Sequence, residues 1–499
     1  MKYDLTIEPW IPVQYAGGVR EVSLIDLFAA PTEFRDLAVP FGPERMAVMR
    51  ILVAIVQSAT PGPLDHDLKV RWLRDPKPCA KAVGDYLEEW RPHFDLFDSE
   101  RPFMQQPIEP DEKDGLSVAA LGLDMASGNN VTLFDHHVDS RPPAIEPGRV
   151  ARMLLTTLLC QPGGGVSKPF NRTDSPGTKA LMVMALGGNL WETLVGNCPD
   201  YAGRDSGDAP AWERDPGNDH PDPYGTTPAG WLDFATWRSR AVQLIPDPAD
   251  GLVRRLRLRQ HLKLAEGPPI DPFVPVRRRT GEEPVALRPN PALRLWQQAE
   301  AIYHGLTEER QPKAVRQAAW AFEALDLPLR IFVVGLEVNQ AKISDSRGVV
   351  LPISDALLSD PERVELVGAA AELAKGGESA LFAASKAYCK ALATEGGNEL
   401  ARRWQEPFRA VLGQRFPRFV DAVASAAEAP DRESDAWKAW NEAVRAEALR
   451  RADQIRALQG GTGRGLRAQS LARRALIGVL SRKVPSFKGE KEVVDVANG

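Results

Sequence analysis

The chain has 499 residues, more than one hydrophobic core usually supports, so its length favours a large domain followed by a smaller one. Hydrophobic residues make up 43% of the sequence and charged residues 26%, a balance typical of soluble proteins that excludes global disorder. The formal net charge is -5, but the segment from Arg445 to Lys483 carries ten Lys or Arg against two acids, which favours contact with a polyanion.

The N-terminal third is predicted to combine a hairpin with buried helices. Residues 5–24 place β-branched residues on both sides of Gly17 and Gly18, a pattern typical of a hairpin. Apolar residues then recur at helical spacing in three segments. We predict helices at 42–60, from about 82 to the residue before Pro92, and at 147–160.

Three irregular segments accompany these helices. Phe94, Phe97 and Phe103 are predicted to anchor an aromatic loop to the core. Residues 116–147 show few helical signals, and loops of this length inside compact domains are more often functional than idle. Residues 199–230 are rich in Pro, Gly and Asp, which predicts a surface excursion.

The C-terminal part changes from strands to alanine-rich helices. Strand-like segments at 252–288 and 329–353 flank two predicted helices, at 291–304 and 312–325. After residue 359, helices separated by short breaks are predicted at 360–374, 378–394, 398–427, 431–458 and 465–482. Short connections of this kind favour an antiparallel arrangement.

The sequence therefore predicts an α+β protein in two domains and a tail. Residues 1–358 are predicted to form a large, mixed but mostly helical domain with β-hairpins. Residues 359–485 are predicted to form an antiparallel four-helix bundle, and residues 486–499 a flexible tail.

A triple glycine follows the predicted helix at 147–160. Gly163, Gly164 and Gly165 lack Cβ atoms, so their backbone can approach a partner closely and adopt positive φ. With Lys168 nearby, the segment can lie against a sugar-phosphate backbone. The same glycines can also serve only to end the helix, and the local sequence leaves both interpretations open.

Two predicted hairpins carry polar side chains. Arg277, Arg278 and Arg279 follow a strand and precede a Thr-Gly turn, which places positive charge at an exposed tip that either attracts phosphates or only aids solubility. Asn339 and Gln340 lie between strands that begin at about Ile331 and Val349. Their amides can contact base edges or wedge between bases, although a polar hairpin without a partner is the alternative.

Catalytic motifs are scarce in this sequence. His136 and His137 are adjacent, between Asp135 and Asp139, but no HxxxH or HExxH spacing completes a metal site. The sequence also contains no GxSxG, no GxxxxGK[ST] and no GxGxxG before a helix. A metal-dependent hydrolase acting through Asp135, His136 and His137 remains the rival from another functional class.

The sequence offers neither a membrane anchor nor a disulfide framework. No apolar run approaches the roughly 18 to 20 residues of a membrane-spanning helix, and the N-terminus lacks a signal core, so a cytoplasmic location is expected. The four cysteines are widely scattered, and we expect all of them to be reduced and without a metal.

Five motifs in register resemble a known family. They lie in the first 350 residues and read IEPWIPV with VSLIDLF, FDLFDSERPFMQ, TLFDHHVD, LLCQPGGGVSKPF and GLEVNQAKISDSR. The chain is identified by them as similar to the large subunit of the type I-E CRISPR Cascade surveillance complex, the CasA family. The C-terminal helices resemble this family only in kind. Some members carry a zinc-knuckle-like cysteine cluster that this chain lacks, so no metal or cofactor is expected.

The resemblance implies how the larger domain works. In such proteins it recognises the protospacer-adjacent motif of invading double-stranded DNA, largely from the minor-groove side. A glycine loop, a basic hairpin and a glutamine wedge converge on the duplex. These elements fall on Gly163 to Gly165 with Lys168, on one of Arg277 to Arg279, and on Gln340 with Asn339 beside it. Phe134, Asp135 and His136 match the loop that docks the subunit near the 5' handle of the guide RNA.

The resemblance also implies partners and a division of labour. Guide pairing reads the long target, while this subunit starts strand separation and is itself inert as a nuclease. Its expected partners are the other Cascade subunits, the guide RNA, the target duplex and a helicase-nuclease recruited afterwards. A basic face can hold the displaced strand; its candidate residues are Arg450, Arg451, Arg456, Arg467, Arg473 and Arg474. A scaffold subunit without DNA recognition is the third alternative.

Overall fold

The computed structural model describes residues 1–59, 65–110, 115–125, 141–200, 207–267, 271–277, 282–307, 313–339, 342–454 and 462–485. The chain divides into two compact units. The N-terminal unit comprises Met1–Pro291 with Gly305–Val350, and the C-terminal unit comprises Ala292–His304 with Leu351–Gly499. The sequence placed one division after residue 358; in the structure residues 292–304 join the later helices.

The chain begins with the predicted hairpin. Strand β1 (Ile11–Tyr15) pairs antiparallel with β2 (Gly18–Val22). Gly18 has a φ of 128°, a conformation that residues with a side chain disfavour, so the turn requires glycine here. A short third strand, β3 (Asp36–Leu37), pairs with the other edge of β1. Helix α1 (Leu24–Ala29) is capped at its N-terminus by Ser23, whose hydroxyl accepts a hydrogen bond from the Asp26 amide.

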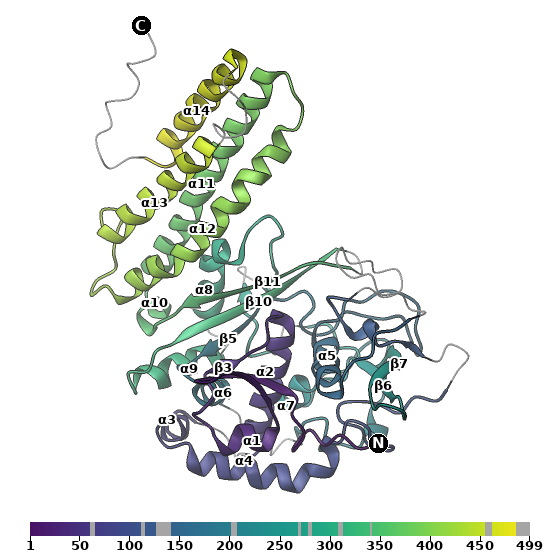
Figure 1. Ribbon diagram of the computed structural model, residues 1–499. Helices are drawn as coiled ribbons and strands as arrows, with labels where there is room; N and C mark the ends of the chain where they lie inside the picture. Colours follow the sequence, from purple (N-terminus) through teal and green to yellow (C-terminus); the bar gives the residue numbers. More distant parts are fainter. Residues whose placement is uncertain are drawn as a thin grey trace. The chain divides into compact units, whose positions relative to one another are not determined.

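Buried helices form the centre of the N-terminal unit. Helix α2 (Gly42–Ser58) is buried along nearly its whole length and packs against α5 (Pro147–Cys160), as the apolar spacing predicted. Around them lie α3 (His66–Arg74), α4 (Lys77–Trp90), α6 (Leu190–Asn197), α7 (Trp231–Ala235) and α9 (Lys313–Glu323) (Figure 1). The unit also contains the short 3-10 helices η1 (Arg91–Phe94), η2 (Val118–Leu121) and η4 (Pro216–Asn218).

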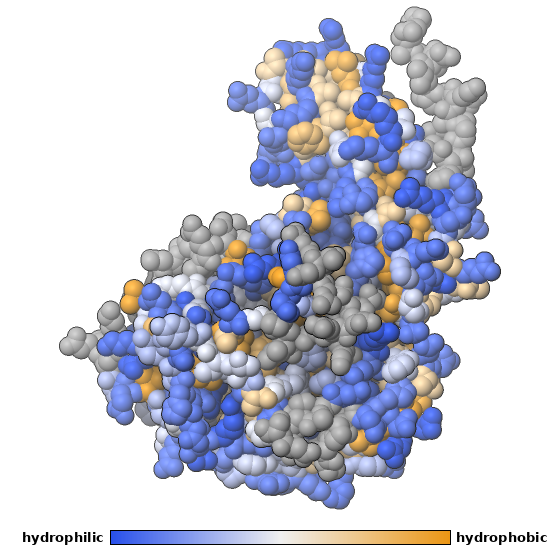
Figure 2. All heavy atoms as spheres, turned by 180° about the vertical axis from the view of Figure 1, so that it is seen from behind, coloured by the Kyte–Doolittle hydropathy of each residue, from blue (hydrophilic) through white to orange (hydrophobic). Residues whose placement is uncertain are grey.

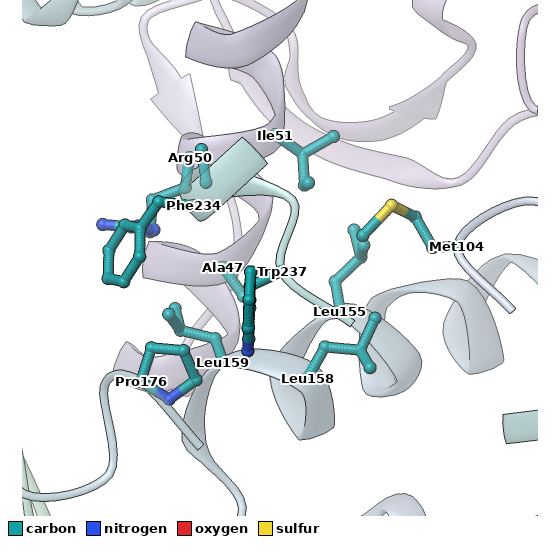
Figure 3. A pocket seen from close by; sticks show the side chains of 11 residues that line it. Ala47, Arg50, Ile51, Met104, Leu155, Leu158, Leu159, Pro176, Phe234 and Trp237 are labelled. Carbon is teal, nitrogen blue, oxygen red and sulfur yellow. The ribbon is translucent and has the colours of Figure 1, made fainter. Parts of the chain in front are cut away.

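A buried ion pair ties α2 to a distant segment. The Arg50 side chain is 1% exposed, and its Nη1 donates to both carboxylate oxygens of Asp271, at 2.9 and 2.7 Å. Figure 3 shows Arg50 and Phe234 beside the small cavity that Leu155 and other α5 residues line (Figure 3). Because a buried charge needs a partner, this pair fixes residues near 271 against α2.

Two three-stranded sheets and a short hairpin complete this unit. The first has the order β11-β10-β5, where β5 (Met182–Leu186) pairs antiparallel with β10 (Arg330–Asn339) and β11 (Lys342–Pro352) is the outer strand. The second has the order β4-β7-β6, built from Leu116–Ser117, Val253–Gln260 and Arg240–Pro246. The hairpin pairs β8 (Val276–Arg277) with β9 (Val285–Ala286). The strands predicted on both sides of residue 340 are thus confirmed. The strand predicted before Arg277 is present only as Val276–Arg277, so Arg277 lies within it.

The predicted surface excursion at 199–230 is wrong for part of its length. Trp212 is only 4% exposed, and its ring lies 5.4 Å from that of Phe94 and 5.9 Å from that of Phe103. The Pro, Gly and Asp content gave no sign of this burial because one aromatic side chain anchors the segment. Phe94 and Phe103 are buried core residues, as predicted.

The C-terminal unit is a helical region. Its elements are η5 (Leu295–Gln298), α8 (Ala299–Thr307, shared with the N-terminal unit at its end), α10 (Asp355–Ser359), α11 (Pro361–Leu392), α12 (Gly397–Ser425), α13 (Asp435–Asp453) and α14 (Gly463–Lys483). Helix α11 packs along α12, α13 and α14. Trp296, from the inserted segment, packs on Phe416 and Trp440 at ring distances of 5.0 and 6.1 Å.

The predicted break between residues 374 and 378 is wrong, because α11 runs unbroken through Gly376 and Gly377. Both glycines are buried. A Cβ at Gly377 would lie 2.6 Å from Phe408 Cζ and 3.1 Å from Val444 Cγ1. Gly377 therefore lets α12 and α13 approach α11, while Gly376 leaves room for Lys483 and Val484 at the end of α14. Tertiary packing outweighs the low helix propensity of both glycines.

None of the described helices is both long enough and apolar enough to cross a membrane.

Candidate nucleic-acid interface

The triple glycine forms an exposed loop directly after α5. The helix ends at Cys160, and Gln161 already has extended backbone. Gly164 and Gly165 have φ values of 124° and 82°, in the region that side chains disfavour, and both are exposed. At Gly165 an added Cβ would meet no atom within 4 Å, so its backbone faces open space.

Gly163 is constrained for a different reason. A Cβ there would lie 2.7 Å from the Thr173 carbonyl carbon, because the two legs of the loop touch at this point. The Gly164 amide donates to the Arg172 carbonyl at 2.9 Å, and the Gly163 amide donates to Asp174 Oδ1 at 2.8 Å. The loop is therefore closed at its base and open at its tip, which is more structure than a helix stop requires.

Arg240, at the start of β6, supports the loop from below. Its side chain is fully buried, and every acceptor it contacts is an uncharged oxygen of the loop legs or of neighbouring strands. Nε donates to Gln161 Oε1 at 2.9 Å, Nη1 to Ser239 O and Gln260 Oε1, and Nη2 to Gln161 O, Pro162 O and Thr173 O. Burial and, secondarily, the charge of Arg172 lower the pKa of Arg240 to about 10.

The loop carries more positive than negative charge. Lys168 is exposed at the tip, Arg172 is half-buried in the second leg, and Arg240 lies beneath both. Asp174 faces them, but it is itself paired with Lys179 at 2.5 Å. An exposed glycine backbone beside more cations than anions suits a phosphate-bearing partner.

The basic hairpin is present, and its first arginine is described. Arg277 is exposed on β8, opposite Val285 of β9. Arg278 and Arg279 lie outside the described residues. The backbone flanking this hairpin is hydrogen-bonded to β5 and the residue before it. The Leu181 amide donates to the Leu287 carbonyl, and the Val183 amide donates to the Phe273 carbonyl.

The hairpin formed by β10 and β11, on which the wedge is predicted, belongs to the sheet β11-β10-β5. Asn339 is the last residue of β10, while Gln340 lies outside the described residues. Strand β5 pairs with β10 and also accommodates the backbone flanking the basic hairpin, and residues 175–181 connect the glycine loop to β5. The three predicted elements are thus attached to one strand and its neighbours, while the meeting of their tips stays a prediction.

Comparison with known proteins decides the family. The model of the family described as CRISPR-associated protein Cse1 matches residues 4–451, about nine-tenths of the chain. The chain belongs to the Cse1 family. A curated relative, CRISPR-associated protein CasA/Cse1 of Thermus thermophilus, is 29% identical over 425 residues, which cover 83% of this chain and 79% of the relative.

Solved structures agree with this Cse1 assignment. The structure of Thermus thermophilus CasA (Cse1) has a TM-score of 0.76 at 26% identity and covers 96% of this chain and 99% of that chain. A chain of a CRISPR RNA-guided surveillance complex shares the fold, with a TM-score of 0.71 at 21% identity over 95% and 99% of the two chains. The resemblance to the CasA large subunit of type I-E Cascade is confirmed.

The cationic candidates on the C-terminal helices of this Cse1 protein differ in environment. Arg467 and Arg474 are exposed on α14, and Arg473 pairs with Asp453 at 3.3 Å. Arg450 is half-exposed and pairs with Glu447. Arg451 is only 12% exposed and also binds Glu447, so it is an internal ion-pair partner rather than a surface cation. Arg456 lies outside the described residues.

The exposed face of these helices is not uniformly basic. Figure 2 shows apolar side chains among the hydrophilic ones on the helical unit (Figure 2). The large exposed apolar side chains of the described C-terminal helices are those of Phe382, Leu466 and Leu471.

Phe134, Asp135, His136 and His137 lie outside the described residues. In the part of the chain that the structure describes, no group of three His, Cys, Asp or Glu side chains is arranged to hold a metal ion. All four cysteines are buried and free, and burial raises the pKa of Cys160 and of Cys198 to about 12.

Sequence reasoning missed two sets of residues, one at the base of the glycine loop and one on strand β7. Arg240 and Asp174 hold its base, and no local motif marks either of them. Strand β7 carries Arg255, Arg257 and Arg259 at alternating positions, a pattern visible in the sequence RRLRLRQ. These three donate to the carbonyls of Gly115, Ile108 and Glu109, so they hold that segment against the sheet.

Replacing Asp174 with alanine should loosen the loop without unfolding the protein. The change removes the acceptor of the Gly163 amide and should lower the free energy of unfolding by about 1 kcal/mol. Hydrogen exchange of the Gly163 amide should become faster. Asp174→Asn keeps an acceptor oxygen and serves as the control; equal exchange in the alanine variant and the native chain would show that the bond is not protective.

Proposed function

We propose that this Cse1 protein recognises the protospacer-adjacent motif of foreign double-stranded DNA within an RNA-guided Cascade complex. The observation that carries the proposal is the glycine loop. It is closed at its base by Arg172 and Asp174, supported by Arg240, and open at Gly164 and Gly165. Such a loop offers backbone close to a groove without side chains in the way, which suits contact with the sugar-phosphate edge.

The other elements then have distinct roles. One of Arg277, Arg278 and Arg279 supplies a phosphate contact, and Gln340, with Asn339 beside it in the sequence, is the wedge. Gln340 inserts beside the motif and displaces the first base pair, which costs a few kcal/mol of unstacking that backbone contacts and guide pairing offset. Because minor-groove readout is degenerate, several related motifs should be accepted.

The remaining regions serve the assembled complex. The loop at Phe134, Asp135 and His136 docks the subunit near the 5' handle of the guide RNA. The C-terminal helices form an antiparallel four-helix bundle whose exposed arginines, Arg450, Arg467 and Arg474 among them, hold the displaced strand. The subunit recruits a separate helicase-nuclease and performs no cleavage itself, and the whole assembly works in the cytoplasm.

The direct test is binding of the reconstituted complex to duplexes that differ only in the motif. Affinity should depend on the motif and should fall with rising salt. A complex that binds every duplex equally well would instead indicate a scaffold subunit. Cleavage by the purified subunit with a stoichiometric divalent ion would favour the hydrolase.

Gln340→Ala should slow target opening by about tenfold, because the variant cannot support the unstacked step. Opening is followed by fluorescence of a base analogue placed next to the motif. The control is Gln414→Ala, which removes an exposed glutamine from α12. Normal opening by Gln340→Ala would count against the wedge while leaving motif binding to be judged separately.

A further inference from the structure

A groove of about 310 Å³ lies in the N-terminal unit between the start of α2 and strands β10 and β11. Most of the residues that line it are apolar in type, although backbone and polar atoms also face the groove, and its single charged side chain is that of Arg45. The lining residues used below are Phe41, Gly42, Arg45, Phe332, Gly348 and Val349. None of the sites discussed above uses this groove.

Gly348 keeps the floor of the groove open. An added Cβ would lie 3.3 Å from Phe332 Cε2, so a side chain here would project over the Phe332 ring. The φ of Gly348 lies outside the left-handed region, which means that the backbone does not demand glycine. The missing side chain therefore matters for the space it leaves.

The groove follows an edge of the sheet. β11 is the outer strand in the order β11-β10-β5, and its second edge has no neighbouring strand in the described residues. Three consecutive residues, 348–350, line the groove. Since alternate residues of a strand point to opposite faces, consecutive lining residues mean that the backbone edge itself borders the groove. Such an edge can pair with an added strand.

The charged side chain of the groove, that of Arg45, is held between an aromatic ring and a carboxylate. The Arg45 guanidinium carbon is 4.5 Å above the Phe332 ring centre, and Nη2 is 2.5 Å from Asp36 Oδ2. The buried Arg45 Nε has no acceptor in the described part of the chain. Burial raises the pKa of Asp36 despite the attraction of Arg45, so loss of solvation by the Asp36 carboxylate outweighs its stabilisation by Arg45.

The chemistry of the lining decides the class of partner. A nucleic acid needs several cations along its path, and this groove offers only Arg45 among its lining residues. A peptide needs backbone partners, an apolar pocket and at most one charge contact, all of which are present. The amides at the start of α2 add positive potential near Arg45, because Phe41 provides no side-chain cap.

We propose that this groove binds an extended peptide segment of a partner protein. The segment adds as a strand along the edge of β11, places an apolar side chain over Gly348, and directs a carboxylate toward Arg45. The proposal does not depend on DNA recognition, since it uses neither the glycine loop nor the two hairpin tips.

The test is selection of displayed random peptides of about eight residues, a typical strand length, on the full chain. Gly348→Leu, which fills the floor, is used for counter-selection. Enriched peptides should alternate apolar and polar residues and carry a carboxylate. A labelled peptide from the selection should bind Gly348→Leu about tenfold more weakly than the native chain. N-methylation of its alternate amides should weaken binding similarly, because the strand hydrogen bonds are lost.

Two further variants control for folding. Gly267→Leu changes an exposed glycine elsewhere in the same unit and should bind normally. Arg45→Gln should weaken carboxylate-bearing peptides more than their amide analogues, even if Gly348→Leu misfolds. Failure to enrich any peptide, equal binding by Gly348→Leu and the native chain, or binding of an oligothymidylate that Gly348→Leu abolishes would each overturn the proposal.

Discussion

Arg240→Ala is expected to lower the free energy of unfolding by about 3 to 5 kcal/mol. The arginine is fully buried, and its three nitrogens donate to oxygens of residues 161, 162, 173, 239 and 260. Alanine removes one donor from each of these oxygens and leaves a cavity beside the glycine loop. Denaturant unfolding of the full chain measures the loss, and motif-dependent DNA binding should fall with it.

Two control variants separate charge from geometry. Arg240→Lys keeps the charge, but one ammonium group cannot reach acceptors on both legs of the loop, so an intermediate loss is expected. Arg255→Ala removes an exposed arginine of the same sheet and should cost about 1 kcal/mol or less. An Arg240→Ala protein as stable as the native chain would mean that the loop base does not depend on this side chain.

Gly377→Leu should destabilise the C-terminal unit by about 3 kcal/mol, the upper end of overpacking costs in well-packed cores. The new side chain would project into Phe408 and Val444, which α12 and α13 hold in place. In a unit of this size such a loss corresponds to a transition about 6 to 12 °C lower. Calorimetry of the full chain measures the shift.

The matched control is Gly478→Leu on α14. Gly478 is exposed, and a Cβ there would meet nothing within 4 Å. Removing a glycine from a helix interior should therefore stabilise the unit by about 0.5 to 1 kcal/mol. Opposite signs at two glycines of adjacent helices would identify packing as the cause; destabilisation at both would point to a general intolerance of leucine.

Local pattern predicted those parts of the fold whose causes are local. The spacing of apolar residues located α2 and α5, and turn residues located the hairpin after β1. Gly377 misled because its low helix propensity is visible in the sequence, while the Phe408 ring that requires it lies about thirty residues away. The burial of Trp212 was missed for the same reason. Its segment is rich in Pro, Gly and Asp, and its aromatic partners, Phe94 and Phe103, lie more than a hundred residues earlier.

The candidate site divides in the same way. Gly164 and Gly165 were recognisable because backbone freedom is a property of the residue itself. Arg240 was not, because its role arises only when the start of β6 folds against residues about eighty positions earlier. Gln340 was chosen through resemblance rather than geometry, and its role stays a prediction.

The segment at 292–304 affects how this protein can be dissected. The chain passes between the two units after residues 291, 304 and 350, so no single cut separates them. A fragment that starts at residue 351 would lack Trp296, leaving Phe416 and Trp440 without a ring they pack against. A chimaera that takes only the contiguous C-terminal helices from a relative would therefore combine the relative's residues at 416 and 440 with the host's residue at 296, so the packing of these three rings would no longer be matched.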